Sequence, residues 1–157
     1  MATAGIRPGD LVLDIGAGTG ALTAPLVRAG ARVIAVELHP KRAARLRSRF
    51  PRPAVTVVQV DASDLRLPRR PFRVVANPPF GVITAIMRRL LSPGSRMTTA
   101  DLVLPRHVAR RWTDAKAPAF RRWGMTFSAR TIAELPPSSF KPRAPGGTLV
   151  LRIERRA

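Results

Sequence analysis

Asn77, Pro78, Pro79 and Phe80 carry the groups with the clearest capacity for chemistry in this sequence. They follow Phe72–Ala76, an apolar run with the length and sharp borders of a buried strand. Prolines fix φ, remove amide donors and keep the preceding residue out of the helical region, so Asn77 is predicted to be extended with its side chain projecting. An amide oxygen, a rigid carbonyl and an aromatic face can together hold an amino group on a flat ring. A plain proline turn is the alternative, so the neighbouring motifs must decide.

A glycine-rich loop follows the first predicted strand. Leu11–Ile15 is an apolar run that leads into glycines at positions 16, 18 and 20, and residues 21–29 are predicted to form a helix. Glycines at such a place let the backbone turn sharply and approach a ligand closely. The spacing is shorter than the dinucleotide fingerprint, and Asp14 at the end of the strand would repel a pyrophosphate. The loop therefore favours a cationic ligand.

A carboxylate ends the second predicted strand, Arg32–Val36. Glu37 lies about twenty residues after the glycine loop, where an acid can accept both hydroxyls of a ribose. An isolated acid at a strand end is commonly just exposed, but its distance from the loop favours the ribose role. Leu38 beside it could cover one face of an adenine.

A second carboxylate ends the third predicted strand, residues 55–60. Asp61 can accept a hydrogen bond from the amine of an adenine, whereas Asp64 is predicted to be a turn or cap residue. Together with Asp14 and Glu37, Asp61 predicts a pocket for a nucleoside attached to a positively charged group.

The charge of the chain indicates a polyanionic partner. The 28 basic and 9 acidic residues give a formal net charge of +19, far more than solubility requires. All but three of the basic residues are arginines, which bind phosphate bidentately and stack on bases, as RNA with exposed loops requires.

The densest basic stretch, residues 106–122, is interleaved with Trp112, Phe120 and Trp123. Such a pattern can follow phosphates and stack unpaired bases. The alternative is a helix whose aromatic residues face the core, and at least one tryptophan is expected to do so. The predicted RNA-binding residues are Arg106, Arg110, Arg111, Lys116, Arg121 and Arg122.

Other classes of site are disfavoured by composition. The chain has no cysteine and only two histidines, so no disulfide, zinc ribbon or thiol nucleophile is expected, and no metal site is predicted. No apolar run reaches membrane-spanning length and the first ten residues lack the core of a signal peptide. We expect a cytoplasmic protein that does not bind membranes. The sequence indicates no particular oligomeric state.

The remaining pattern predicts an α/β fold. A helix is expected at residues 82–91, and further strands at residues 100–104, 125–132 and 148–153, which makes seven strands in all. At 157 residues the chain has the size of one domain.

With these motifs placed in order, the sequence resembles class I S-adenosylmethionine-dependent methyltransferases, and more narrowly the Erm and KsgA family of rRNA adenine methyltransferases. The motifs that carry the resemblance are DIGAGTGALT at residues 14–23, VANPPFG at residues 75–81 and FKPR at residues 140–143. The resemblance covers nearly the whole chain. It implies a Rossmann-like, mostly parallel seven-stranded sheet with helices on both faces.

The resemblance also implies a function. S-adenosylmethionine would be the cofactor, rRNA or a ribosomal subunit the partner, and the exocyclic N6 amine of an adenine the methyl acceptor. Asn77, Pro78 and Phe80 would form the catalytic base pocket. The expected cofactor-binding residues are Asp14, Gly16, Ala17, Gly18, Glu37, Leu38, Asp61, Ala62 and Asn77. The arginine-rich pattern favours an Erm-like enzyme, which acts on 23S rRNA and confers macrolide-type resistance.

The sequence departs from the family pattern at three places. The family's N-terminal Gln-Asn-Phe-Leu segment and its C-terminal helical domain have no counterpart, and residues 144–147 differ from the family's usual Pro and Val-Asp-Ser. We therefore expect a single catalytic domain, residues 1–157, that itself provides the RNA contacts.

Several alternatives remain open from the residues. One is a KsgA-like dimethyltransferase of the small subunit, and another is an RNA-binding assembly factor or degenerate fragment that does not catalyse. The same tetrapeptide also serves enzymes that act on DNA adenine, rRNA guanine or the glutamine of release factors. The positive charge disfavours a protein substrate, and residues 140–143 favour rRNA adenine over DNA.

Overall fold

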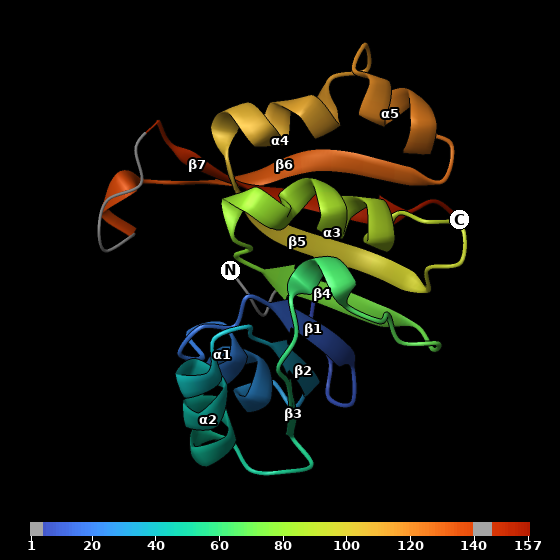
Figure 1. Ribbon diagram of the computed structural model, residues 1–157. Helices are drawn as coiled ribbons and strands as arrows, with labels where there is room; N and C mark the ends of the chain where they lie inside the picture. The colour runs from blue at the N-terminus through green and yellow to red at the C-terminus, as the bar shows by residue number, and fades with distance from the viewer. Residues whose placement is uncertain (1–4, 140–145) are drawn as a thin grey trace. The chain divides into compact units, whose positions relative to one another are not determined.

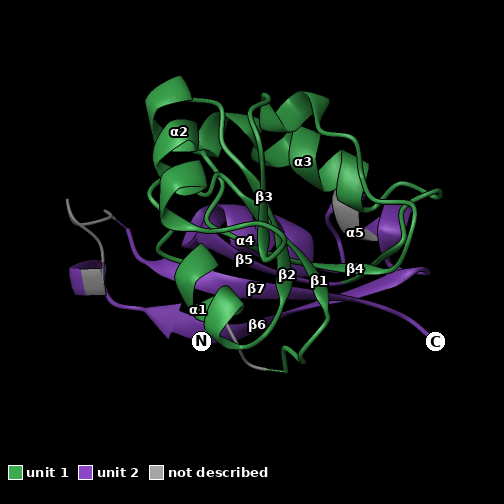
Figure 2. Cartoon of the chain, turned by 90° about the horizontal axis from the view of Figure 1, so that it is seen from below, with its two compact units in different colours: residues 1–98 green, residues 99–157 purple. Residues whose placement is uncertain are grey.

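The computed structural model describes residues 5–139 and 146–157, and the chain divides into two compact units. Unit 1 is Met1–Thr98 and unit 2 is Thr99–Ala157 (Figure 2). Each unit has its own strands and helices and is described by itself.

Unit 1 contains four parallel strands in the order β3-β2-β1-β4 (Figure 1). Their register aligns Ile15 with Val36, and Val36 with Val58, so these three strands end level with one another. Neighbouring parallel strands place their carboxyl ends at one edge of a sheet. The strands are β1 (Leu11–Ile15), β2 (Arg32–Val36), β3 (Val55–Val58) and β4 (Phe72–Ala76).

Helices cover both faces of this sheet. Helices α1 and α2 lie on one side of the strands and α3 lies on the other (Figure 2). Short 3-10 turns follow two of the strands: η1 follows β3, and η2 follows β4 and leads directly into α3. The bounds are α1 (Thr23–Arg28), α2 (Pro40–Arg49), η1 (Ala62–Asp64), η2 (Phe80–Val82) and α3 (Ile83–Leu90).

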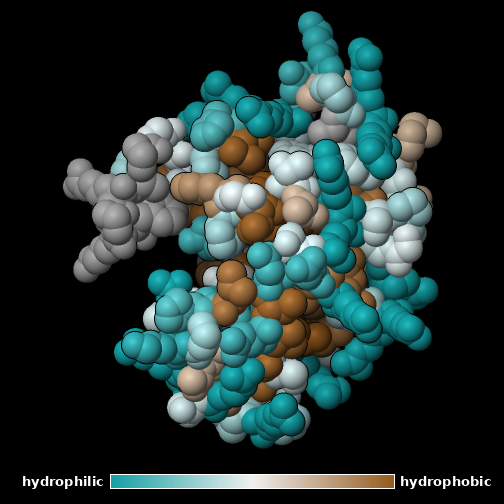
Figure 3. Space-filling model, viewed as in Figure 1, coloured by the Kyte–Doolittle hydropathy of each residue, from teal (hydrophilic) through white to brown (hydrophobic). Residues whose placement is uncertain are grey.

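The two faces of the sheet are packed differently. Alternate residues such as Val12, Val33 and Val55 pack with the buried Leu26 and Leu46 in one core cluster. On the opposite face, Leu13, Ile34 and Val58 line a hollow of about 360 Å³ beneath the connection that follows η1. Hydrophobic side chains, brown in Figure 3, accordingly reach the surface between hydrophilic ones.

Unit 2 is an antiparallel sheet with strand order β5-β7-β6 and two short helices. The registers pair Leu102 with Leu151 in β5 and β7, and Ser128 with Glu154 in β6 and β7, with an irregularity between Thr131 and Ala133. The elements are β5 (Met97–Pro105), α4 (Arg106–Thr113), α5 (Pro118–Trp123), β6 (Phe127–Leu135), η3 (Pro137–Ser139) and β7 (Thr148–Arg155); β5 begins two residues before the unit boundary.

All seven predicted strands are present; β1, β2 and β4 have the predicted bounds, and the bounds of the other four are shifted. β3 ends at Val58 instead of Val60, because the chain turns there into η1, and β6 runs to Leu135, three residues further than predicted. α1 begins at Thr23, two residues late, since the glycine loop takes up the first residues of the predicted helix. The FKPR motif lies outside the described residues.

An ion pair joins β5 to β7 inside unit 2. The guanidinium of Arg152 donates two hydrogen bonds of 2.7 Å to the carboxylate of Asp101, and both side chains are largely buried. The carboxylate raises the pKa of Arg152, so the cation persists at any physiological pH.

Asp101→Ala is expected to lower the free energy of unfolding by about 2–4 kcal/mol, because it leaves the Arg152 cation without its partner. Arg130→Ala is the matched control, since the pair between Arg130 and Glu154 spans 3.7 Å between exposed side chains. The control should change stability by less than about 0.5 kcal/mol. Urea unfolding measures both variants, and equal small effects would show that the Asp101 pair is not structural.

Candidate functional site

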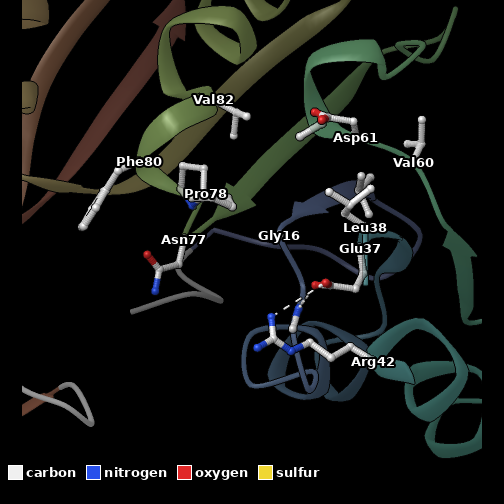
Figure 4. Close-up of a pocket in the computed structure, with 14 residues that line it drawn as sticks. Gly16, Glu37, Leu38, Arg42, Val60, Asp61, Asn77, Pro78, Phe80 and Val82 are labelled. Atoms are coloured by element: carbon white, nitrogen blue, oxygen red, sulfur yellow. Dashed lines mark hydrogen bonds and ion pairs between the residues drawn. The ribbon is translucent and has the colours of Figure 1, made fainter. Parts of the chain in front are cut away.

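A pocket of about 410 Å³ opens at the carboxyl ends of the unit 1 strands (Figure 4). It is lined by the glycine loop, the residues after β2 and β3, and the tetrapeptide after β4. Pockets of this size hold small ligands. The lining residues are Gly16, Gly18, Val36, Glu37, Leu38, Arg42, Val60, Asp61, Ala62, Asn77, Pro78, Pro79, Phe80 and Val82.

The glycine loop needs glycine at two positions for steric reasons. Gly16 has φ +76°, and a Cβ there would lie 3.1 Å from Cδ of Pro79. Gly20 has φ +95°, and a Cβ would lie 2.7 Å from the ring of Phe50. The amide of Gly16 donates to the carbonyl of Val36 at 2.9 Å, which ties the loop to β2. The loop therefore passes close to the tetrapeptide and to α2.

Glu37 holds its carboxylate in place through backbone donors. Its Oε2 accepts from the amide of Gly18 at 2.8 Å and its Oε1 accepts from the amide of His39 at 3.0 Å. The guanidinium of Arg42 lies 4.0 Å from Oε1 (Figure 4). Each carboxylate oxygen can accept a second hydrogen bond, so Glu37 can bind hydroxyl groups without giving up these contacts.

Asp61 lies on the far side of the pocket from Asn77 (Figure 4). Its Oδ1 accepts from the amide and the hydroxyl of Ser63, and these bonds lower the pKa of Asp61. The carboxylate is thus ionised, with Oδ2 left to accept from a ligand. Asp64 lies in the 3-10 turn η1, as its predicted turn role requires, and Asp61 is the residue that caps this turn.

The tetrapeptide presents Asn77 and Phe80 at the surface and buries Pro78. Among the described residues, the side-chain amide of Asn77 has no hydrogen-bond partner, so both its oxygen and its nitrogen are available. Phe80 is 70% exposed, and Leu38 across the pocket is 60% exposed. Large apolar side chains exposed at a pocket indicate a ligand that covers them.

Two of the predicted cofactor residues lie beneath the pocket instead of lining it. Asp14 is only 1% exposed and accepts a 2.6 Å hydrogen bond from the hydroxyl of Thr23, while its Oδ1 has no partner in the described part of the chain. Ala17 is buried in the core cluster. Burial raises the pKa of Asp14 from 3.8 to about 6, and the nearby Glu37 adds to the rise.

Five lining residues were not among the predicted ones: Val36, Arg42, Val60, Pro79 and Val82. Val36 and Val60 lie at the ends of predicted strands, and Pro79 lies within the Asn-Pro-Pro-Phe motif. Their places in the sequence could therefore have indicated that they line the pocket. Nothing in the sequence indicated that Arg42 lines the pocket, because only the packing of α2 brings it there.

The predicted RNA-binding residues all belong to unit 2. Arg110, Arg111, Lys116, Arg121 and Arg122 are exposed on or between α4 and α5. Arg106 is less exposed and forms an ion pair with Glu134.

The two tryptophans of this region stack on each other. The ring centroids of Trp112 and Trp123 lie 5.4 Å apart, and the guanidinium of Arg122 lies 5.1 Å from the Trp123 ring. These aromatic residues therefore join α4 to α5, and both are only half-buried, whereas at least one of them was expected to face the core. The side chain of Phe120 lies outside the described residues.

Residues 5–139 and 146–157 contain neither a candidate metal site nor a candidate membrane-spanning helix. No group of three or more histidine, aspartate and glutamate side chains suited to a metal ion occurs there. Over the same residues, no helix combines the length and apolar composition that crossing a membrane requires.

The fold is that of the class I S-adenosylmethionine-dependent methyltransferases. The family model for ribosomal RNA adenine dimethylase matches residues 1–157. The chain belongs to this family, which confirms the resemblance found in the sequence.

Known relatives agree with this assignment. The chain is 37% identical over 145 residues to an rRNA adenine N-6-methyltransferase of Corynebacterium diphtheriae, covering 90% of this chain and 57% of the relative. It is 32% identical over 160 residues to the ribosomal RNA small subunit methyltransferase A of Acinetobacter baylyi, covering 94% and 58%. The chain thus spans little more than half the length of these relatives.

The structural comparison confirms the Rossmann-like methyltransferase fold class. The structure of the 23S rRNA methyltransferase ErmE superposes with a TM-score of 0.86 at 30% identity, covering 99% of this chain and 65% of that one.

Asp14→Asn is expected to make stability less dependent on pH. The folded protein binds the Asp14 proton more tightly than the unfolded chain does, so stability falls as pH rises from about 4 to about 6. Above that window the ionised carboxylate costs about 3 kcal/mol. Asparagine does not ionise and can still accept the Thr23 hydrogen bond, so its advantage over wild type should grow by about 2 kcal/mol between about pH 4.5 and pH 7.5.

Urea unfolding at the two pH values measures this change, with the exposed Asp64→Asn as control. The control should differ from wild type by the same amount at both pH values. An Asp14→Asn advantage that does not change with pH would contradict the assigned pKa.

Proposed function

We propose that this chain methylates the exocyclic N6 amine of an adenine in rRNA, using S-adenosylmethionine, and that residues 1–157 act as the catalytic domain. The single observation that carries the proposal is the position of Asn77–Phe80 at the rim of a pocket that also holds Glu37 and Asp61. Membership of the rRNA adenine dimethylase family supports it.

The pocket fits the cofactor on chemical grounds. Glu37 offers oxygens for the hydroxyls of a ribose, Asp61 an ionised acceptor for an adenine amine, and the exposed Leu38 an apolar surface for the ring. Gly16 has no side chain to hold the loop away from Pro79 and the carbonyl of Asn77, so the glycine loop and the tetrapeptide lie against each other as adjoining parts of the pocket wall. S-adenosylmethionine supplies a methyl group on a positively charged sulfur when bound, and the acidic groups favour that charge.

Asn77 and Pro78 hold the acceptor amine. The side-chain oxygen of Asn77 and the carbonyl oxygen of Pro78 accept hydrogen bonds from the two N–H groups of the amine. These bonds draw the lone pair of the amine nitrogen out of conjugation with the ring. The adjoining prolines fix these acceptors before the base arrives, so little ordering remains to be done. Phe80 stacks on the target base, which must leave any helix it occupies.

An Erm-like role, with 23S rRNA as substrate and macrolide-type resistance as the outcome, is the finer form of the proposal. The 30% identity to the ErmE structure and the 37% identity to the Corynebacterium relative support it. The basic residues of α4 and α5 would contact the RNA. Since bacterial ribosomes are cytoplasmic, the proposal also places the protein in the cytoplasm.

A KsgA-like role on the small subunit is the second candidate, favoured by the 32% identity to the Acinetobacter enzyme. Incubation with tritiated S-adenosylmethionine and either purified 23S or 16S rRNA, followed by mass mapping of the labelled nucleotide, separates the two. Label in neither RNA, nor in intact subunits, would favour a non-catalytic RNA-binding role.

Asn77→Ala should lower methyl transfer by at least about 100-fold, because the exocyclic amine loses one of the two acceptors that hold it in place. Pro79 contacts the loop but offers no acceptor from its side chain, so Pro79→Ala should retain far more activity. Tritium incorporation into rRNA measures both variants, and circular dichroism checks their folding. Near-normal transfer by folded Asn77→Ala would refute its role.

Glu37→Gln should weaken cofactor binding by about 10- to 100-fold, since two hydrogen bonds from the ribose lose a charged acceptor. Glutamine keeps the shape but only one acceptor oxygen, so the bond from the amide of Gly18 or His39 is also lost, and circular dichroism checks that the variant is folded. Calorimetry with S-adenosylhomocysteine measures the change, and Glu134→Gln in unit 2 is the control. Unchanged affinity in Glu37→Gln would remove the ribose assignment.

A further inference from the structure

A second hollow in unit 1 carries three arginines beside the pocket described above. This groove of about 590 Å³ lies between the connection that follows η1 and the helix α3. Arg66 enters it from the connection, and Arg88 and Arg89 enter it from the last turn of α3. The residues that line it include no carboxylate.

The three arginines differ in whether they form a hydrogen bond within the protein. Arg89 donates from Nη1 to the carbonyl of Leu65 at 3.0 Å, which ties α3 to the connection. Arg66 and Arg88 are exposed and, within the described part of the chain, make no ion pair or hydrogen bond. Clustered cations repel one another, and guanidinium groups bind phosphate bidentately, so an anion with phosphate oxygens satisfies this arrangement.

The groove is adjacent to the pocket through two structural links. Ser63, which lines the groove, donates both its amide and its hydroxyl to Asp61, which lines the pocket. Phe80 begins the 3-10 turn that leads directly into α3, and Arg88 lies in the last turn of α3, eight residues and roughly 12 Å further along the helical segment. A nucleic acid strand whose base lies at Phe80 can therefore pass along α3 to the groove.

We propose that this groove binds phosphate groups of the RNA strand that flanks the target adenine. The inference rests on the proposed function, because that function supplies the strand. It assigns to unit 1 a phosphate contact separate from the basic residues of α4 and α5. Arg66 and Arg88 bind the backbone, and Arg89 supports the groove through Leu65.

The test compares two double variants that remove the same charge. Arg66→Ala/Arg88→Ala changes the groove, whereas Arg45→Ala/Arg47→Ala removes two exposed arginines of α2 that line neither hollow. Fluorescence anisotropy with a labelled RNA hairpin that carries one unpaired adenine gives the affinity across a range of salt concentrations. Calorimetry with S-adenosylhomocysteine checks that the pocket and the fold are intact.

The groove variant should bind the hairpin about tenfold more weakly. Its slope of log affinity against log salt should become shallower by about 1.4, because each single-strand phosphate that an arginine neutralises adds about 0.7 to the slope. The α2 variant should keep the wild-type slope. An unchanged slope in the groove variant, or equal weakening in both, would overturn the proposal.

The outcome is separable from that of the proposed function. If wild type methylates rRNA and the groove variant keeps its slope, the groove proposal fails alone. If binding depends on the groove but no RNA is methylated, the proposed function fails and the phosphate site stands.

Discussion

Parallel pairing of the four unit 1 strands is the constraint from which the site follows. The backbone bonds continue past the strand ends, since the amide of Gly16 donates to Val36 at 2.9 Å and the amide of Glu37 donates to Val58 at 3.1 Å. These bonds hold the residues after β1, β2 and β3 level at one edge. Groups about twenty positions apart in sequence therefore converge on one pocket, as they do in open α/β sheets generally.

The acidic and basic residues are distributed so that different parts of the molecule favour ligands of opposite charge. Of nine acidic residues in a chain with net charge +19, Asp14, Glu37 and Asp61 gather at or just beneath the pocket. A small cation is thus favoured at the pocket, while the surplus of arginine elsewhere favours a polyanion. Methyl transfer to RNA requires two ligands of opposite charge, a cationic methyl donor and a polyanionic acceptor. The distribution of acidic and basic residues suits both.

Several features near the pocket oppose stability. Asp14 is buried with one oxygen unpartnered among the described residues, and Leu38 and Phe80 expose apolar surface. Local features that weaken a fold tend to be found at functional sites, where a ligand or a reaction requires them. Their concentration around one pocket is a physical reason, independent of the motifs, to place the function there.

The sequence by itself determined the strands, the glycine loop, the two strand-end acids and the Asn-Pro-Pro-Phe motif, because short-range patterns of apolar residues, glycine and proline dictate local conformation. It could not show that Asp14 would be covered by Thr23, that Asp61 would cap η1, or that Trp112 would stack on Trp123. Nor could it place Arg42 at the pocket or Arg66 beside Arg88. Some of these contacts are close in sequence, such as Asp61 with Ser63, and others are distant, but all of them depend on how the turns, helices and connections pack at the ends and faces of the sheet, which local sequence patterns do not determine.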